Sequence, residues 1–430
     1  MYLTKAREIR RVGFVSTRIS GSDGVSLEIE KWAAVLERMG YECHYCAGVS
    51  DRPTARSTVV AEAFFGHPEI AALQALCFGR THRDESTTGE LHRLRLLIKK
   101  GLYDFVERFS IDLVIVENAL AIPMNVALGL ALTEFLAETG MPAIGHHHDF
   151  SWERQRFTMS GIEDIITSSF PPRVHSMNHV VINTEARQQL CFRRGLSSIV
   201  IPNVFDFEAP PPPLDDYARN LRADLGIGES DILLLQPTRI VARKGIEHAI
   251  ELAGRLSSSM SDRKIRLLVS HPERDEGSDY FHRVIDYARY LEVDLVIAPE
   301  RIARDRGIAN DGRRVYSLAD CYLNADFVTY PSSYEGFGNA FLEAVYYRKP
   351  ILVNRYSIFE SDIEPVGFKV ALMDSFVTPE VIRHVRRLIE EAPLREEAVS
   401  ANFELGRRYF SYALLEQRLR VAMMNFGVVG

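Results

Sequence analysis

The sequence has few cysteines, and none of them suggests a disulfide framework. Five occur among 430 residues, an odd number without regular spacing, at positions 43, 46, 77, 191 and 321. Cys43 and Cys46 form a C-x-x-C, but the surrounding "YECHYCAG" is typical of a strand, whereas a redox dithiol gains its low pKa at a helix start. We therefore expect buried structural thiols rather than a redox or metal pair, and a reducing, cytoplasmic compartment.

Long hydrophobic runs and an excess of basic charge are also missing. No apolar run approaches the roughly 20 residues of a membrane-spanning helix, and residues 1–16 lack the apolar core of a secretory signal. The 51 Lys and Arg are outnumbered by 58 Asp and Glu, which gives a net charge of -7. This balance disfavours non-specific nucleic-acid binding. We expect no nucleic-acid partner and no transmembrane segment, and leave the oligomeric state open, with a homodimer as one option.

What the chain does contain is a repeated alternation of strand-like and helix-like segments. A chain of 430 residues exceeds one typical core, so two domains are expected. Four consecutive prolines, Pro210–Pro213, cannot lie inside a helix or a central strand and indicate the boundary. The alternation on both sides predicts an α/β fold of two doubly wound, Rossmann-like domains facing a central cleft. The predicted ranges are 1–208, a Pro-rich linker at 209–215, a second domain at 216–408, and a final helical segment at 409–430.

The stretch "YPSSYEGFGNAFLEAV" (330–345) places two glutamates eight positions apart. Glu335 is expected in a loop made flexible by Gly336 and Gly338, and Glu343 in the second turn of the helix that follows. At ~1.5 Å rise per residue, Glu343 stands about 7.5 Å along the axis from Gly338. The two carboxylates are then too separated to share a proton. The spacing favours two hydroxyl-binding groups along one extended ligand.

Two further stretches follow strand ends. In "QPTRIVARKG", Arg239 and Lys244 lie where a strand gives way to a helix, and a guanidinium fork with an ammonium suits a diphosphate. The alternative is a solvated loop with two exposed bases. In "SGSDGVSLE", Gly21 and Gly24 permit a turn whose helix-start amides could meet an anion. That loop lacks G-x-G-x-x-G spacing, and an ordinary helix cap is the alternative.

Three consecutive histidines begin "HHHDFSWERQRF" at the end of another expected strand. Residues alternate sides along a strand, so His146 and His148 should face one way and His147 the other. Three such neighbours cannot chelate one ion from an extended strand, so no metal site is predicted. Polar or catalytic histidines at the edge of a cleft are the preferred interpretation.

Together these motifs resemble the GT-B retaining glycosyltransferases of family 4. The resemblance rests on the E-x7-E pattern within "PSxxEGFGxxxLEA", supported by "TRxxxRKG" (238–245), "IPNVFD" (201–206), His148–Asp149 and the "DGVSLE" loop, in the family's order. It spans residues 12 to about 355. It implies that the C-terminal helix, 409–430, packs back on the N-terminal domain.

The resemblance also implies roles for individual residues. Arg239 and Lys244 match the cations that hold the donor diphosphate and stabilise it as the leaving group. Glu343 matches the glutamate that binds the nucleotide ribose, Glu335 the one that contacts sugar hydroxyls, and His148 the histidine close to the reacting sugar. The implied catalytic set is His148, Arg239, Lys244 and Glu335. The implied donor-binding set is Gly24, Arg239, Lys244, Glu335, Gly336, Phe337, Gly338, Asn339 and Glu343.

Such enzymes use front-face attack, in which the acceptor hydroxyl enters beside the departing diphosphate. The resemblance therefore implies no protein nucleophile, no metal and no cofactor. One departure from the family pattern is "LLVSHPE" (267–273), where Ser270 and His271 replace a common Gly-rich turn.

Basic residues near the histidines suggest the acceptor. Arg18, His146, Arg154 and Arg156 would make that side of the cleft cationic, which favours a small anionic or phosphorylated acceptor such as a sugar phosphate or a glycerate derivative. Surface ion pairs of Arg154 and Arg156 are the alternative. The expected acceptor-binding set is Arg18, Asp23, His146, Asp149, Arg154 and Arg156.

The sequence leaves the donor and the reaction class open. UDP-glucose and GDP-mannose both fit, with a slight preference for UDP, and ADP is a third option for the base. A GT-B sugar-nucleotide epimerase or phosphorylase is an alternative enzyme, although no motif for a pyridoxal-phosphate lysine is found. A non-catalytic sugar-nucleotide-binding protein is the third hypothesis. It would have no physical need for all of His148, Arg239, Lys244, Glu335 and Glu343.

Overall fold

The computed structural model consists of two compact units. It describes residues 9–21, 23–271 and 278–426 of the chain. Unit 1 comprises Met1–Asn203 and Tyr412–Gly430, and unit 2 comprises Val204–Ser411. The divisions therefore fall after 203 and 411, where the sequence suggested 208 and 408, and the proline run lies within unit 2.

Unit 1 is built on a seven-stranded sheet in the order β5-β3-β1-β6-β7-β8-β9. Its strands are β1 (Arg11–Val15), β3 (Glu42–Ala47), β5 (Ser57–Val59), β6 (Leu113–Glu117), β7 (Ala143–His147), β8 (Met177–Val181) and β9 (Ser198–Val200). All neighbouring strands pair in parallel. The strand order reverses between β1 and β6, and ligands of such sheets bind outside the carboxyl ends of the strands at this switch point. A separate two-stranded pair joins β2 (Arg18–Ile19) and β4 (Val49–Ser50).

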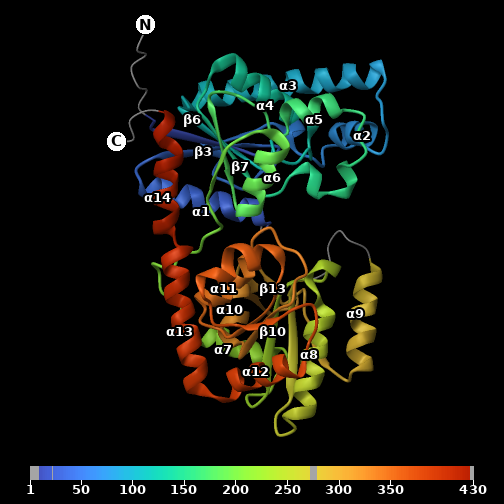
Figure 1. The fold of residues 1–430 in the computed structure, drawn as a ribbon, viewed down its shortest axis with the longest axis vertical. Coiled ribbons are helices and arrows are strands. Elements are labelled where there is room, and N and C mark those ends of the chain that lie inside the picture. Colours follow the sequence, from blue (N-terminus) through green and yellow to red (C-terminus); the bar gives the residue numbers. More distant parts are fainter. Residues whose placement is uncertain (1–8, 22, 272–277, 427–430) are drawn as a thin grey trace. The chain divides into compact units, whose positions relative to one another are not determined.

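Helices cover both faces of this sheet (Figure 1), with α3 and α4 on one face and α1 on the other. The helices of unit 1 are α1 (Gly24–Arg38), α2 (Pro68–Cys77), α3 (Glu85–Phe109), α4 (Val126–Thr139), α5 (Glu163–Ser169), α6 (Thr184–Arg194) and α14 (Tyr412–Met423). The helix α2 was not predicted from the sequence. This helix buries only Ile70, Leu73 and Cys77, which leaves little periodic signal in the sequence.

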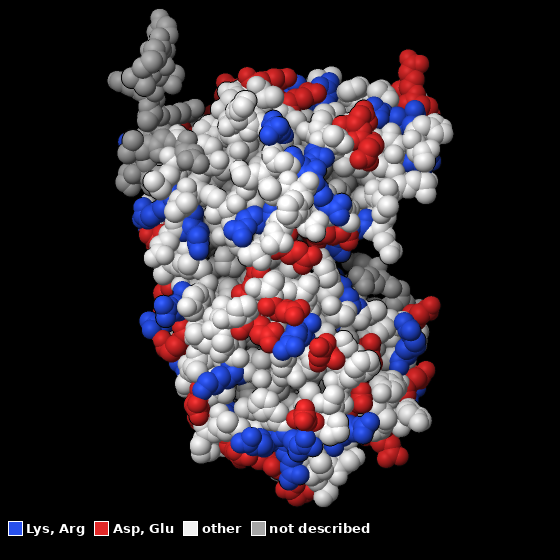
Figure 2. Space-filling model, in the orientation of Figure 1, with Lys and Arg blue, Asp and Glu red and all other residues white. Residues whose placement is uncertain are grey.

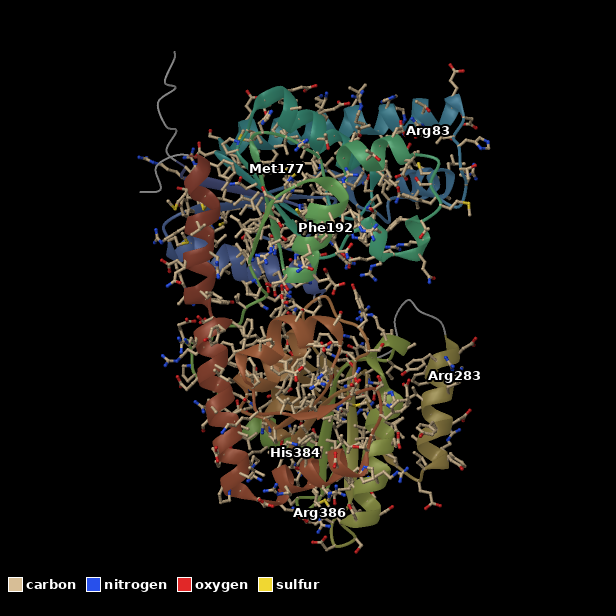
Figure 3. The ribbon with its side chains drawn as sticks, viewed as in Figure 1. Arg83, Met177, Phe192, Arg283, His384 and Arg386 are labelled. Carbon is tan, nitrogen blue, oxygen red and sulfur yellow. The ribbon has the colours of Figure 1, made fainter. Side chains whose placement is uncertain are left out.

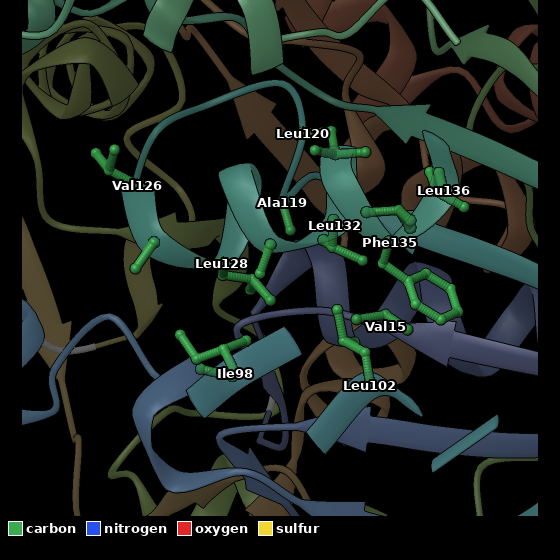
Figure 4. Packing of buried hydrophobic residues seen from close by; sticks show 14 of the residues in the cluster. Val15, Ile98, Leu102, Ala119, Leu120, Val126, Leu128, Leu132, Phe135 and Leu136 are labelled. Atoms are coloured by element: carbon green, nitrogen blue, oxygen red, sulfur yellow. The ribbon is translucent and has the colours of Figure 1, made fainter. Parts of the chain in front are cut away.

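The core of unit 1 lies between the sheet and the pair α3 and α4. Along α3 the buried positions recur at helical spacing, as an amphipathic helix requires: Leu91, Leu94, Ile98, Leu102 and Phe105. Figure 4 shows Leu102 of α3 and Phe135 of α4 meeting Val15 of β1 in this core. Arg83, labelled in Figure 3, precedes α3 and donates two hydrogen bonds to Asp164 of α5, at 2.7 and 2.8 Å.

The last helix, α14, belongs to unit 1 although it is formed by the end of the chain. It packs against α1 (Figure 1). Arg38 at the end of α1 places its guanidinium 5.1 Å from the ring centre of Tyr412. Asn178 of β8 donates a hydrogen bond of 2.8 Å to the carbonyl of Ala422. These contacts attach the C-terminal segment to the N-terminal sheet.

Unit 2 is built on a six-stranded parallel sheet in the order β12-β11-β10-β16-β17-β18. Its strands are β10 (Ile232–Arg239), β11 (Ile265–His271), β12 (Asp294–Ile297), β16 (Phe327–Tyr330), β17 (Ile351–Asn354) and β18 (Ala371–Met373). Its helices are α7 (Asp216–Asp224), α8 (Ile246–Ser259), α9 (Ser278–Tyr290), α10 (Leu318–Asn324), α11 (Asn339–Tyr346), α12 (Pro379–Glu390) and α13 (Ala392–Tyr409). The switch point here lies between β10 and β16.

A small sheet in unit 2 was not predicted. It joins β13 (Ile302–Ala303), β14 (Gly307–Ile308) and β15 (Arg314–Ser317) in the order β13-β15-β14. Strands of two to four residues leave almost no alternation to detect. The prediction of two Rossmann-like units with parallel sheets is confirmed.

The cysteines and the surface agree with the composition. Cys43, Cys46, Cys77 and Cys321 are buried, and Cys191 on α6 is exposed; all five are free thiols. Burial raises the pKa of both Cys43 and Cys46 to about 12, which makes them inert. Charges of both signs are interspersed over the face in Figure 2. Among the residues that the structure describes, no helix is both long and apolar enough to span a bilayer.

Candidate active site

The carboxyl end of β10 in unit 2 carries a buried ion pair. The strand is followed by a 3-10 turn, Ala242–Lys244, and Lys244 is only 9% exposed. Its Nζ contacts a carboxylate oxygen of Glu335, which is 8% exposed. Arg243 donates from Nη1 to the other oxygen of the same carboxylate at 3.2 Å. One acidic group therefore lies between two cations.

Burial and charge act against each other in this pair. Burial lowers the pKa of Lys244, although the nearby negative charge of Glu335 opposes this shift. Burial tends to raise the pKa of Glu335, but Lys244 and Arg243 outweigh it and the pKa lies below its usual value. Glu335 is therefore ionised at neutral pH.

Gly245 explains how the two loops meet. Its φ of 60° is in the left-handed region that favours glycine, and it ends the turn that carries Lys244. A Cβ at this position would lie 2.4 Å from the carbonyl oxygen of Pro331, the residue after β16. Glycine thus allows the loop after β10 to lie directly against the loop after β16. The amide of Ser333 donates to the carbonyl of Arg243 at 2.9 Å and holds the loops together.

Gly338 shapes the start of α11. Its φ is 133°, and a Cβ there would lie 2.4 Å from the hydroxyl of Tyr356. That hydroxyl donates to the carbonyl of Phe337 at 2.6 Å. Phe337 is 2% exposed and packs against Phe410, so only its backbone is placed to meet a ligand. Gly336 and Asn339 are half-buried. The helix begins at Asn339 without a side-chain cap.

Glu343 lies in the second turn of α11, as predicted from its spacing. It is half-buried and accepts a hydrogen bond of 2.9 Å from the hydroxyl of Tyr322. Burial, followed by the charge of Glu343, raises the pKa of Tyr322 well above its usual value, so this phenol remains a donor. Glu335 therefore lies among cations, whereas Glu343 lies beside a phenol.

Arg239 is the exposed last residue of β10. Its positive charge contributes to the lowered pKa of Lys244, which places the two cations in the same electrostatic environment. A buried polar network joins the end of β10 to β16. Gln236 donates to Thr238 at 2.7 Å, and Thr329 of β16 donates to Gln236 at 2.7 Å.

In unit 1 the predicted histidines gather around a carboxylate that the sequence analysis did not single out. Glu117, the last residue of β6, is fully buried. Its Oε2 lies 2.9 Å from Nδ1 of His146 and 3.2 Å from Nε2 of His148. His147 points the other way, with Nε2 at 2.9 Å from Nδ1 of His179. The predicted alternation of the three histidines is confirmed.

Asn118 fixes the turn that follows the histidines. Its φ is 58°, a left-handed conformation that asparagine tolerates. Its side-chain oxygen accepts from the amide of His148 at 3.0 Å, and its side-chain nitrogen donates to Asp149 at 2.8 Å. Asp149 also accepts from Nε of Arg154 at 2.8 Å. Asp149 is thus held by two partners, and the surface ion pair that was the alternative for Arg154 is formed.

The other expected acceptor residues lie in different environments. Arg156 is exposed, contacts the sulfur of Met124, and lies 4.7 Å from the ring centre of Phe157. Among the residues that the structure describes, it has no carboxylate within ion-pair distance. Burial, and then the neighbouring charge of Arg154, lowers its pKa.

Two expectations need correction. His146 is 1% exposed, with its ring stacked on Trp32 at 4.1 Å, so it is enclosed rather than available to an acceptor. Asp23 caps α1 by accepting from the amide of Ser26 at 3.2 Å and pairs with Arg18 at 3.1 Å, so its side chain already serves the fold.

Gly24 begins α1, and a Cβ there would meet no atom within 4 Å. The fold therefore has no packing requirement for glycine at this position. Of the same loop, Ser22 lies outside the described residues, as do Pro272 and Glu273 of the "LLVSHPE" segment; Ser270 is buried at the end of β11.

Among the residues that the structure describes, two groups of side chains bring together the atom types that bind metals. Glu117, His146 and His148 form one, and Glu62, His67 and Glu69 form the other, nearer the surface. In the first group both imidazoles are within hydrogen-bonding distance of one carboxylate oxygen, and these bonds account for the arrangement without an ion.

Sequence reasoning missed Arg243, Tyr322, Glu117 and Asn118. Arg243 lies within the "RKG" of a motif already recognised, and a signal for Glu117 and Asn118 exists in "DLVIVEN", where polar residues end a buried strand. Tyr322 lies in α10 and carries no local signal.

Comparisons with known proteins agree with this arrangement. The chain matches no family profile. It is 34% identical over 381 residues to the mannosylglucosylglycerate synthase of Petrotoga mobilis, covering 85% of this chain and 86% of that protein. It is 31% identical over 444 residues to the mannosylglucosylglycerate synthase of Thermotoga maritima, covering 95% and 98%.

Solved structures show the same fold. A glycosyltransferase from Rickettsia africae superimposes with a TM-score of 0.67 at 12% identity, covering 97% of this chain and 99% of that one. The Anabaena protein HepE, in complex with UDP and glucose, gives 0.67 at 13% identity, covering 97% and 100%. With these matches, and with two parallel-sheet units each carrying polar residues at its switch point, the chain belongs to the GT-B glycosyltransferases of the family 4 type that include the mannosylglucosylglycerate synthases.

Proposed function

We propose that the protein is a retaining hexosyltransferase that moves a sugar from a nucleotide-diphosphate sugar to a small anionic acceptor. The observation that carries this proposal is the buried Lys244–Glu335 pair, flanked by Arg243, at the switch point of unit 2. An ion pair enclosed to this degree costs desolvation energy and is weak evidence for stability alone. Its place at the carboxyl edge of a parallel sheet favours a role in binding.

Lys244 and Arg239 hold the donor diphosphate in this proposal. A lysine ammonium has three donors, and contact with Glu335 uses one of them. The others can meet phosphate oxygens, and a partly dehydrated cation stabilises the charge that develops on the diphosphate more strongly than one in water. Glu335 and Glu343 accept hydrogen bonds from hydroxyls of the sugar and the ribose respectively.

The reaction needs no protein nucleophile. The bond between the anomeric carbon and the diphosphate oxygen breaks, and a bond from the acceptor oxygen to the same carbon forms on the same face. The proton of the acceptor hydroxyl passes to an oxygen of the departing diphosphate. The residues contribute positioning and charge stabilisation, so we expect activity without added metal.

The acceptor is proposed from the relatives and from one arginine. Both relatives are named for a product that contains mannose, glucose and glycerate. By likeness we propose a nucleotide-linked mannose as donor and glucosylglycerate as acceptor, and GDP then replaces UDP as the preferred base. Arg156, exposed and without a carboxylate partner among the described residues, is the proposed contact for the glycerate carboxylate.

The test compares matched substrates with the purified protein. GDP-mannose, UDP-glucose and ADP-glucose are each offered with glucosylglycerate and with glucosylglycerol, its neutral analogue, in the presence of EDTA. We expect transfer from GDP-mannose to glucosylglycerate, and an α-mannosidic product by NMR. Equal turnover of glucosylglycerol contradicts the anionic acceptor, and a β-linked product contradicts retention.

The same assay separates the alternatives. Conversion of a sugar nucleotide without an acceptor supports an epimerase, and consumption of a glycoside that requires phosphate supports a phosphorylase. Stoichiometric binding of a sugar nucleotide with no turnover of any pair supports a non-catalytic protein.

A further inference from the structure

We propose that Glu117 is a positioning residue for His148: its carboxylate accepts the Nε2–H of this imidazole, so that Nδ1 is the ring nitrogen presented to the ligand. The inference rests on the proposed function and on the match of His148 to the family's histidine close to the reacting sugar. The carboxylate does not touch the substrate in this proposal and acts through the histidine.

The backbone on both sides of this contact is fixed. Glu117 ends β6 at the switch point of unit 1, and the hydroxyl of Ser16, after β1, donates to its carbonyl at 3.0 Å. The amide of His148 donates to the side chain of Asn118 at 3.0 Å. The carboxylate and the imidazole are therefore held by separate anchors, and their own contact sets only the rotation of the ring.

Exposure distinguishes His148 from the two side chains that it contacts. The side chains of Glu117 and His146 are 0% and 1% exposed, whereas that of His148 is 11% exposed. Nε2 of His148 faces the enclosed carboxylate at 3.2 Å. The two ring nitrogens have distinct roles, because the partner of one determines what the other offers. Nδ1 is thus the nitrogen left for a ligand.

His146 makes the carboxylate rigid. Its Nδ1 lies 2.9 Å from the same Oε2. Its ring is stacked on Trp32 of α1 at a centre distance of 4.1 Å and lies tilted against the ring of His148 at 4.4 Å. An oxygen that accepts from two imidazoles cannot rotate away from one without losing the other. His146, which is itself too enclosed to contact a ligand, thus helps to fix the carboxylate that orients His148.

The charges around the pair favour a cationic His148. Burial tends to raise the pKa of Glu117, but the two histidines outweigh it and lower the pKa to about 2. Burial lowers the pKa of His148, yet Glu117 raises it above its usual value, with smaller contributions from Glu28 of α1 and from Asp149. Burial lowers the pKa of His146, the other imidazole at this carboxylate. Glu28 itself forms an ion pair with Lys31. When His148 is protonated, Nδ1–H donates to a ligand oxygen.

The first test measures turnover of Glu117→Gln, which keeps the shape of the side chain but removes its charge. We expect kcat to fall on the order of 100-fold, the cost of a misplaced group, with KM for both substrates little changed. Glu28→Gln is the matched control, since it removes another buried carboxylate near the pair without touching the Glu117–His148 contact. Equal losses in the two variants would overturn the proposal.

A double variant tests whether Glu117 acts through His148. If it does, Glu117→Gln should cause no further loss in a His148→Ala background, because the group that it positions is already gone. A full additional loss in that background would show an independent role and overturn the inference.

A readout without catalysis separates this inference from the proposed function. In protein labelled with 15N-histidine, the signals missing from His148→Ala identify His148. We expect Nε2 of His148 to be protonated in the wild type and its pKa to fall in Glu117→Gln; an unchanged pKa and tautomer overturn the proposal. If the protein transfers no sugar but shows these NMR changes, only the proposed function fails.

The metal content of the purified protein is a separate test. One zinc ion per chain, lost in Glu117→Gln, would make the carboxylate a metal ligand and overturn the positioning role.

Discussion

At the scale of single residues, the chain places buried charges where its two sheets reverse their order. In unit 2 a carboxylate lies between Lys244 and Arg243, and in unit 1 a carboxylate lies between His146 and His148. In each case the acidic group ends or follows a strand next to the switch point. Buried charges at such places are candidates for function because stability gains little from them.

The first prediction concerns Lys244. Lys244→Ala removes the proposed diphosphate contact, and we expect kcat to fall on the order of 100-fold to 1,000-fold, as for the loss of one group that stabilises developing charge. Arg255→Ala on α8, an exposed residue with an i,i+4 partner, should change the rate by less than about twofold. Steady-state kinetics and a thermal melt check this. Activity that survives in folded Lys244→Ala would refute the diphosphate assignment.

The second prediction uses two glycines at the two ends of α1. A Cβ at Gly24 meets nothing within 4 Å, so Gly24→Ala should leave stability unchanged or improve it by about 0.5 kcal/mol while it reduces turnover, if the donor approaches there. Gly40 has a φ of 93°, so Gly40→Ala should cost about 1 kcal/mol and leave the activity of the folded protein intact. Urea unfolding and kinetics on both variants measure this. Full activity in Gly24→Ala would argue against ligand contact at this turn.

At the scale of elements, the middle one of the three histidines, His147 at the end of β7, forms a buried pair with His179 of β8. His147 and His179 are 0% and 6% exposed, with 2.9 Å between their ring nitrogens. Burial lowers the pKa of His147 well below its usual value and that of His179 to about 4. Both rings are neutral in the folded protein near pH 7. The pair therefore resists protonation for as long as the sheet is intact.

The third prediction is a loss of stability in mild acid. An unfolded histidine binds a proton near pH 6.5, whereas folded His179 binds one only near pH 4. Between these values the unfolded state holds more protons, so stability falls as the pH decreases from about 6.5 to 4, by on the order of 3 kcal/mol. Urea unfolding at several pH values measures the slope, and His179→Gln should reduce it. An identical slope in the variant would show that other groups dominate.

The elements also show what a sequence can and cannot predict. The eight-residue strand β10 begins with a continuous apolar run, and the amphipathic helix α3 has clear helical periodicity, so the existence of both follows from the residues. The two-residue strands β13 and β14 gain their structure from neighbours and carry no such signal. The E-x7-E stretch located the unit 2 site. The role of Glu117 depends on partners about thirty residues later in the chain, which only the folded sheet brings together.

At the scale of the whole molecule, the two units share the same sheet topology, although unit 1 is formed by two separate segments of the chain. The strand order reverses after the first strand of each sheet, and each switch point carries polar side chains. The second segment contributes α14, which packs on α1, the helix that begins at Gly24. The position of α1, and of its N-terminal turn, thus depends on α14.

The fourth prediction tests this dependence. Leu419 on α14 is fully buried, so Leu419→Ala should destabilise unit 1 by about 2 to 5 kcal/mol. Hydrogen exchange should show lost protection in α1 and α14, with little change in β10 and β11 of unit 2. Val421→Ala, at a position that is 49% exposed, is the control and should leave exchange unchanged. Uniform loss across both units would contradict a local role for α14.

One exposed thiol gives the protein a natural attachment point. Cys191 lies on α6 beside Phe192, which is 84% exposed, while the other four cysteines are buried. A maleimide dye should therefore label the folded wild-type chain at one site, on unit 1, without any engineered residue. Fluorescence from that dye offers a direct titration of sugar nucleotides or acceptors. Energy transfer to a second dye on unit 2 would measure the distance between the two units.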